Sequence, residues 1–166
     1  MVLQSMEALV LDAVVIGLGA TAFMDLASVV RARLGAPFPD YGLVGRWLAY
    51  VARRRLAHDV IAQRAPVKGE ALIGWSAHYV IGVGYAALLL LAFPGWLAEP
   101  TLAPALIVGI ATVLAPFLIM QPGMGMGLFA SRTPNPNAAR LRAFITHLLF
   151  GLGLYLAGVA HVFVFA

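Results

Sequence analysis

Four long apolar stretches dominate the hydrophobicity pattern of the chain. They run from about residue 8 to 30, from 71 to 93, from 102 to 121 or beyond, and from 138 to 164, and turn-forming segments rich in proline and glycine separate them. Each is long enough for a helix to cross the apolar core of a bilayer, which takes about 20 residues. The pattern predicts an all-α polytopic membrane protein, a four-helix transmembrane bundle forming one domain over residues 1–166. Asn137 is the expected N-cap of the fourth helix.

A shorter amphipathic segment follows the first apolar stretch. Its apolar residues recur at the spacing of one helix face, with arginines on the other side. The apolar positions are Leu43, Val44, Trp47, Leu48 and Val51. We expect a cytoplasmic helix over about residues 40–55, capped by Asp40 and lying in the membrane interface. The expected membrane-surface residues are Arg46, Trp47, Arg53, Arg54 and Arg55. A solvated basic loop that only sets orientation is the alternative.

Composition supports this class of protein. Of the 166 residues, 62% are hydrophobic and 11% are charged, whereas soluble domains have about 45–50% apolar and about 25% charged residues. So little polar surface excludes a soluble enzyme or nucleic-acid-binding domain as the expected class. The chain has no cysteine, which excludes disulfides, thiolate metal sites and thiol redox chemistry.

The positive charges are confined to two segments. Eight of the eleven lysines and arginines lie between the first and second apolar stretches, and the other three lie just before or at the start of the fourth stretch. By the positive-inside rule these segments are cytoplasmic and both chain termini are periplasmic. The net charge of +4 therefore reports topology first. The expected partners are the lipid bilayer and anionic lipids at its cytoplasmic face, and no nucleic acid.

Ionisable side chains inside the apolar stretches form the candidate site. Asp25, His78 and His147 lie in the cytoplasmic halves of their stretches, roughly 8–15 Å below the charged boundary. Gln121 joins them if the third helix continues through Pro122. Such groups are costly inside a bilayer and usually face the bundle interior or a cavity. We expect the four side chains to converge in one polar layer.

Small and polar residues at helical spacing mark the inward faces of three stretches. The stripes are Gly17, Thr21, Asp25 and Ser28; Gly74, His78, Gly82 and Tyr85; and His147, Gly151, Tyr155 and Gly158. Small residues at such spacing let membrane helices approach closely, so packing alone also explains the glycines. Towards the opposite face, Asp12 and His161 are candidates for a peripheral ion pair or for solvent exposure.

Several roles fit the expected polar layer. A buried Asp–His pair can simply hold helices together, or it can bind a proton or a small ligand. A transition metal fits Asp25, His78 and His147, with Gln121 as a weak ligand or as a donor to a ligand. Two histidines on separate helices can also ligate a haem iron axially. The sequence leaves these alternatives open.

The third stretch carries two prolines that bear on its shape. Pro116 removes one backbone hydrogen bond, and Pro122 begins a glycine-rich run that can end the helix. A kinked helix and a broken helix both fit this sequence. Met120, Met124 and Met126 lie in the same region and offer thioether ligands for Cu(I), although methionine at such spacing commonly fills cores.

Several short stretches of the sequence resemble a family of small four-span bacterial inner-membrane proteins of unknown function. They are Gly17-Leu18-Gly19-Ala20-Thr21-Ala22-Phe23-Met24-Asp25, Tyr41-Gly42-Leu43-Val44-Gly45-Arg46-Trp47, Gly74-Trp75-Ser76-Ala77-His78-Tyr79, Ala115-Pro116-Phe117 with Gln121-Pro122, and Ser131-Arg132-Thr133-Pro134-Asn135-Pro136 with His147. The resemblance spans nearly the whole chain. It implies a four-span protein of the bacterial inner membrane and supplies no reaction or ligand.

Enzyme motifs are absent from the sequence. It has no serine-hydrolase elbow, no glycine-rich phosphate loop and no zinc-protease helix. We therefore expect a non-enzymatic inner-membrane protein whose polar layer binds a proton, a small ligand or a metal. The alternative is an accessory or assembly subunit of a larger membrane complex. A homo-oligomer is a further candidate assembly for a chain of this size.

Overall fold

A computed structural model describes residues 5–165 of the chain, and these residues form helices and no strand. Four helices are long and apolar enough to cross a membrane: Met6–Arg33, Glu70–Ala92, Leu102–Gly123 and Pro136–Phe165. They confirm the predicted all-α fold and indicate a multi-pass membrane protein. Residues 1–4 and 166, which the predicted domain includes, lie outside the described residues.

Three of the crossings are single helices, α1 (Met6–Arg33), α3 (Glu70–Ala92) and α6 (Pro136–Phe165). The third crossing consists of α4 (Leu102–Ala111), the π-helical turn η3 (Pro116–Met120) and α5 (Gln121–Gly123). The connections contain α2 (Tyr41–Val51) and the 3-10 turns η1 (Ile61–Gln63), η2 (Trp96–Ala98) and η4 (Leu128–Ala130).

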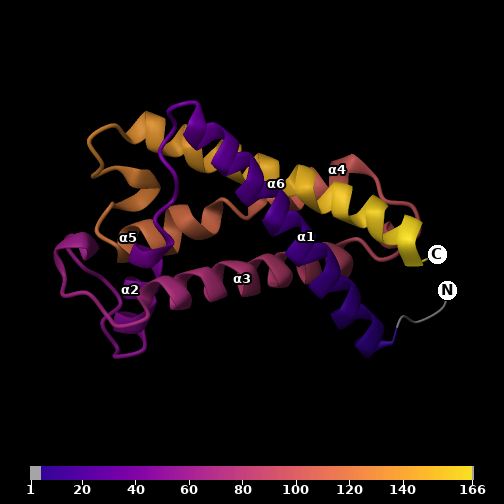
Figure 1. Cartoon of the computed structure of the whole chain (residues 1–166), viewed down its shortest axis with the longest axis horizontal. Helices are drawn as coiled ribbons and strands as arrows, with labels where there is room; N and C mark the ends of the chain where they lie inside the picture. The colour runs from indigo at the N-terminus through magenta and orange to yellow at the C-terminus, as the bar shows by residue number, and fades with distance from the viewer. Residues whose placement is uncertain (1–4, 166) are drawn as a thin grey trace.

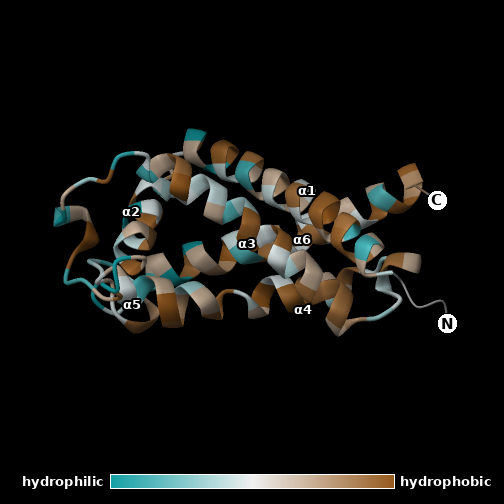
Figure 2. Cartoon of the chain, turned by 90° about the horizontal axis from the view of Figure 1, so that it is seen from below, coloured by the Kyte–Doolittle hydropathy of each residue, from teal (hydrophilic) through white to brown (hydrophobic). Residues whose placement is uncertain are grey.

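Helix α1 packs against α3 and α6, and α6 also packs against α4 (Figure 1). The start of α1 and the end of α6 lie at one end of the bundle. Helices α2 and α5 lie at the other end of the bundle. We call this end the basic end and define it as α2, residues 52–69 and the segment from α5 to η4. Hydrophilic residues gather at the basic end and hydrophobic residues follow the length of the helices (Figure 2).

Two predicted helix starts have different outcomes. The side chain of Asp40 accepts a hydrogen bond from the Leu43 amide at 3.2 Å, which confirms it as the N-cap of α2. The predicted cap of the fourth helix at Asn137 is wrong by two residues. Asn135 accepts a hydrogen bond from the Ala138 amide at 3.1 Å, and Pro136, which has no amide hydrogen to satisfy, takes the first helical position.

The third crossing changes its helical geometry ahead of the first proline, not at the second. Helix α4 ends at Ala111, and residues 112 and 113 form a turn before helical structure resumes. Pro116 has no N–H, and its ring would clash with the carbonyl four residues earlier, which belongs to Thr112. The chain then continues helically through Pro122 and ends the crossing at Gly123.

Close backbone contact joins α1 to α3. A Cβ atom added at Gly17 would lie 2.5 Å from the Cα of Val83, and one added at Gly82 would collide with the Thr21 hydroxyl. Any larger side chain would therefore push the two helices apart. Close helix packing is therefore one role of these glycines, which agrees with the alternative interpretation of the small-residue stripes.

Two hydrophobic clusters stabilise the bundle. The larger lies between the crossings and includes the fully buried Ile16, Leu89 and Leu154. The smaller lies at the basic end around Tyr50, Ile61 and Met124. The residues packed against the smaller cluster are Leu43, Val44, Trp47, Val67, Met120 and Met126. Much of the apolar face of α2 thus packs onto protein, and the three methionines fill a core.

Candidate functional site

Helices α1 and α3 bring two of the predicted site residues together. The Nε2 atom of His78 lies 3.0 Å from Oδ1 of Asp25, and both side chains are mostly buried, with 14% and 13% of their surface exposed. The other carboxylate oxygen, Oδ2 of Asp25, is buried and has no hydrogen-bond partner among the described residues. The hydroxyls of Tyr41 and Tyr79 nevertheless interact with the Asp25 carboxylate, so donors lie beside this oxygen.

An aromatic cluster, consisting of Phe38, Tyr41, Trp75 and Tyr79, surrounds this pair. The ring of Tyr41 stacks on His78 with 4.2 Å between ring centroids. Trp75 and Tyr79 meet the imidazole edge-on, at 5.8 Å and 5.5 Å. Phe38 completes the cluster by packing near Tyr41 and Trp75. Rings on several sides fix the orientation of the imidazole and limit its contact with solvent.

Tyr41 reaches the pair from α2, which lies outside the four crossings. Helix α2 can come this close to α3 because Gly45 and Gly74 face one another; a Cβ at Gly74 would collide with the Tyr41 carbonyl. Burial, and then the charge of Asp25, raise the pKa of the Tyr41 phenol. The phenol therefore stays protonated at any physiological pH and can serve as a hydrogen-bond donor beside the carboxylate.

His147 lies at the interruption of the third crossing, with a different partner from the predicted one. Its Nδ1 atom lies 3.0 Å from the hydroxyl of Thr112, and that hydroxyl donates to the Gly109 carbonyl at 2.7 Å. Since the single hydroxyl hydrogen is used on Gly109, Thr112 accepts from His147 Nδ1–H, and a neutral His147 then carries its lone pair on Nε2. The turn before Pro116 leaves the Gly109 carbonyl without its usual helical partner, and the Thr112 hydroxyl satisfies it.

Gln121 is buried at the start of α5, and its Oε1 atom has no hydrogen-bond partner among the described residues. It makes no hydrogen bond with Asp25, His78 or His147 in that part of the chain. The four predicted residues are thus divided into a bonded Asp25–His78 pair, a separate His147–Thr112 pair and an unpaired amide.

The predicted metal ligands do not form a three-residue ligand set. Within residues 5–165, no group of three or more histidine, aspartate or glutamate side chains lies close enough to hold a metal ion. His78 directs Nε2 to Asp25 on α1, while His147 directs Nδ1 to Thr112.

A second Asp–His pair lies towards the opposite end of α1. Nε2 of His161, on α6, is 2.9 Å from Oδ1 of Asp12, with 13% and 17% of the side chains exposed. Of the two alternatives that the sequence left open, the two side chains are paired and mostly buried rather than exposed to solvent. Helix α1 therefore pairs one aspartate with α3 and another with α6.

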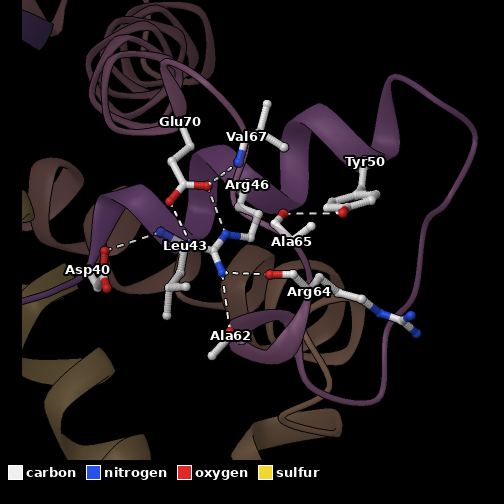
Figure 3. Close-up of polar contacts among 9 residues, drawn as sticks. All are labelled: Asp40, Leu43, Arg46, Tyr50, Ala62, Arg64, Ala65, Val67 and Glu70. Atoms are coloured by element: carbon white, nitrogen blue, oxygen red, sulfur yellow. Dashed lines mark hydrogen bonds and ion pairs between the residues drawn. The ribbon is translucent and has the colours of Figure 1, made fainter.

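At the basic end, Arg46 is an internal residue. Its guanidinium forms a two-bond ion pair with Glu70, at 2.7 and 2.8 Å, and donates to the carbonyls of Ala62 and Arg64 (Figure 3). The hydrogen bond to Glu70 raises the pKa of Arg46. Arg46 thus fixes α2 to the start of α3 and to residues 62–64, while Arg53, Arg54 and Arg55 of the predicted membrane-surface set are exposed.

Sequence reasoning missed several residues of these networks. Thr112 and Glu70 carry no periodic signal, because each acquires its role from a partner on another element. His58 is buried against Gly123, in a segment that reads as a polar loop. Two signals bore on Tyr41: it follows the predicted cap Asp40, and it begins one of the stretches that carry the family resemblance.

Comparison with known proteins gives a family and no activity. No match was found among curated proteins, and no solved structure matches the chain. A family model described as "Protein of unknown function (DUF2938)" matches residues 14–161. This range includes most of the first and fourth crossings, all of the second and third, Asp25 and His78, and the aromatic cluster around them. The chain therefore belongs to the DUF2938 family of proteins of unknown function.

Proposed function

We propose that this protein binds and releases a proton inside the membrane, at the Asp25–His78 pair. The observation that carries the proposal is the buried contact between the Asp25 carboxylate and His78, whose ring is held in place by the aromatic cluster. An ionised carboxylate is costly in an apolar environment. A bound proton removes that cost by neutralising the carboxylate.

The surroundings favour a proton over a larger ligand. Tyr41, Trp75 and Tyr79 occupy the space around the imidazole, and histidine exchanges protons within the physiological pH range. A metal would need further ligands, which the described residues near the pair do not supply. A proton needs only the two groups that are already in contact.

We further propose that the chain resides in a bacterial inner membrane with the basic end in the cytoplasm. Every lysine and arginine lies in the two segments expected on that side. In this orientation the Asp25–His78 pair lies near the cytoplasmic side and the Asp12–His161 pair near the periplasmic side. Cysteine-accessibility labelling of single cysteines introduced at Ser5 and Gln63 tests this orientation, since the chain has no cysteine of its own.

Nuclear magnetic resonance of the ¹⁵N-labelled histidine rings tests the proton site, with the protein in lipid nanodiscs. We expect the His78 ring signals, assigned with His78→Gln, to change with pH, and their midpoint to move in Asp25→Asn. The matched control is Asp12→Asn, which removes the same charge from the other pair and should leave the His78 midpoint in place. A His78 signal that is constant with pH, or that ignores Asp25→Asn, would contradict the proposal and leave the pair a packing element.

A further inference from the structure

The basic end contains a cavity that the proposed proton site does not use. It has a volume of about 440 Å³ and lies between the end of α2 and the segment that leads to η1. The residues that line it are Tyr50, Arg54, Arg55, Leu56, Ala57, His58 and Arg64. Small-molecule sites commonly have volumes of about 300–1,000 Å³, so the cavity can hold a group larger than a water molecule.

The lining of this cavity is strongly cationic. It includes three arginines and no carboxylate among the described residues. Unlike Arg46, which is bonded on several sides, the guanidinium groups of Arg54, Arg55 and Arg64 make no hydrogen bond or ion pair in the part of the chain described. The Arg64 guanidinium points away from the Arg46–Glu70 pair (Figure 3).

His58 adds a buried polar group to the same wall. It is 8% exposed, and its Nδ1 atom lies 3.2 Å from the Gly123 carbonyl, which can only accept a hydrogen bond. Nδ1 therefore carries a hydrogen, and the other ring nitrogen, Nε2, is buried with no partner among the described residues. In the neutral ring this Nε2 is a hydrogen-bond acceptor, which a P–OH group can satisfy.

Arg54 holds its place at a conformational cost. Its φ of 61° lies in the left-handed region, which glycine adopts more readily than a residue with a side chain. The position ends α2, where the amides of Arg54 and Arg55 bond back to Val51 and Tyr50. Strained residues of this kind are often found at functional sites, so the cationic side chain is a candidate for a role that offsets the strain.

From these features we propose that the cavity binds a phosphate group. Guanidinium groups match phosphate oxygens in geometry as well as in charge, and three arginines line this cavity with no carboxylate among its lining residues. Leu56, which is 65% exposed, places an apolar side chain at the same cavity. The phosphate can belong to an anionic lipid headgroup or to a free phosphate, and the chemistry of recognition is the same for both.

Two binding measurements distinguish the sources of the phosphate. In the first, calorimetry follows inorganic phosphate binding to the full chain in a neutral detergent. In the second, native mass spectrometry counts phosphatidylglycerol retained by the chain against phosphatidylcholine. Binding in the first arm supports a free phosphate, and retention in the second arm alone supports a lipid headgroup. No saturable binding in either arm overturns the proposal.

Variants test whether the cavity itself is responsible. Arg55→Gln with Arg64→Gln should weaken phosphate binding by about a hundredfold, since each lost charged hydrogen bond weakens binding by about tenfold. Arg142→Gln is the matched control, an exposed arginine on α6 that does not line the cavity. If the control weakens binding as much as the double variant, the protein attracts anions only through its overall charge and the cavity site is wrong.

Arg54→Gly guards against a folding artefact. Glycine suits the left-handed backbone at this position, so the variant should fold at least as well as the original chain while losing one guanidinium. We expect weaker phosphate binding, by about tenfold, together with an unchanged or higher melting temperature. Unchanged affinity in a folded Arg54→Gly protein would remove Arg54 from the site and contradict the proposed role of its strain.

Discussion

The two Asp–His pairs on α1 have nearly the same geometry and different surroundings. Their nitrogen–oxygen distances are 3.0 and 2.9 Å, and all four side chains are mostly buried. The imidazole of His78 is enclosed by rings of α2 and α3, whereas His161 lines a cavity of about 210 Å³ with Leu97 and Phe165. Two contacts of nearly the same geometry therefore differ in their neighbours: aromatic rings restrict His78, whereas His161 faces a cavity.

The largest expected effect comes from separating α2 from α3. Gly74→Leu places a side chain where the Tyr41 carbonyl lies, so we expect a loss of about 3 kcal/mol in the free energy of unfolding and exposure of His78. Unfolding in increasing sodium dodecyl sulfate measures it. Gly84→Leu is the control on the same helix, because a Cβ at Gly84 meets no atom within 4 Å. Equal losses in both variants would show that the close approach is unimportant.

Double-mutant cycles compare the two pairs directly. For Asp25→Leu with His78→Phe we expect a coupling of about 2 kcal/mol, and for Asp12→Leu with His161→Phe about 1 kcal/mol. The reason is that the aromatic cluster holds His78 in one orientation, whereas His161 lies close to the end of α6. The same unfolding assay supplies the energies. A larger coupling for the Asp12–His161 pair would reverse the comparison.

Removal of Arg46 tests how the surroundings of His78 are maintained. Arg46→Gln leaves Glu70 and the carbonyls of Ala62 and Arg64 without their donor, so amides of residues 61–65 should exchange hydrogen about tenfold faster. Mass spectrometry of deuterium uptake follows this exchange. Residues around Asp12 should exchange at an unchanged rate in Arg46→Gln. The control variant is Arg33→Gln, which alters an exposed arginine and should leave the exchange of the whole chain unchanged. Unchanged exchange at residues 61–65 would show that the ion pair does not order the segment.

The smallest effect at neutral pH is expected from Tyr41→Phe, which keeps the stacked ring and removes the hydroxyl. The variant should change the free energy of unfolding by less than about 0.5 kcal/mol. At alkaline pH the two proteins should diverge. Burial and Asp25 raise the pKa of Tyr41 above its ordinary value of 10.0, so above that pH the unfolded chain releases a proton that the folded chain retains, and stability falls. Tyr41→Phe should lose less stability there, and an identical alkaline loss would contradict the placement of the phenol.

Much of the fold followed from local patterns. The four crossings lie within a few residues of their predicted bounds because helix length and apolar composition are properties of each segment alone. The amphipathic helix was also found, although α2 ends at Val51 rather than near residue 55. The packing of α2 against protein was not predicted, because the same apolar face suits a membrane interface and a protein core. Met124 and Ile61 belong to the core that it meets.

The candidate site was predicted only in part. Ionisable side chains are costly in lipid, and this criterion identified Asp25 and His78 within the crossings. The two side chains are in contact. His147 was expected in the same layer because it has a similar depth in the membrane, and depth does not specify the direction in which a side chain faces. Pro116 decides its partner, since the turn that it imposes offers Thr112 to His147.

By itself, the sequence determined the class of protein, the number of crossings, the distribution of charge and the polar residues that a bilayer disfavours. These properties depend on residues that are neighbours along the chain. Only the tertiary structure decided the partners: Asp25 with His78, Arg46 with Glu70, and the arginines that share a cavity with His58. Such choices depend on which helices adjoin and how each is rotated, and these are set by contacts between distant segments, such as the close approach of Gly17 to Gly82.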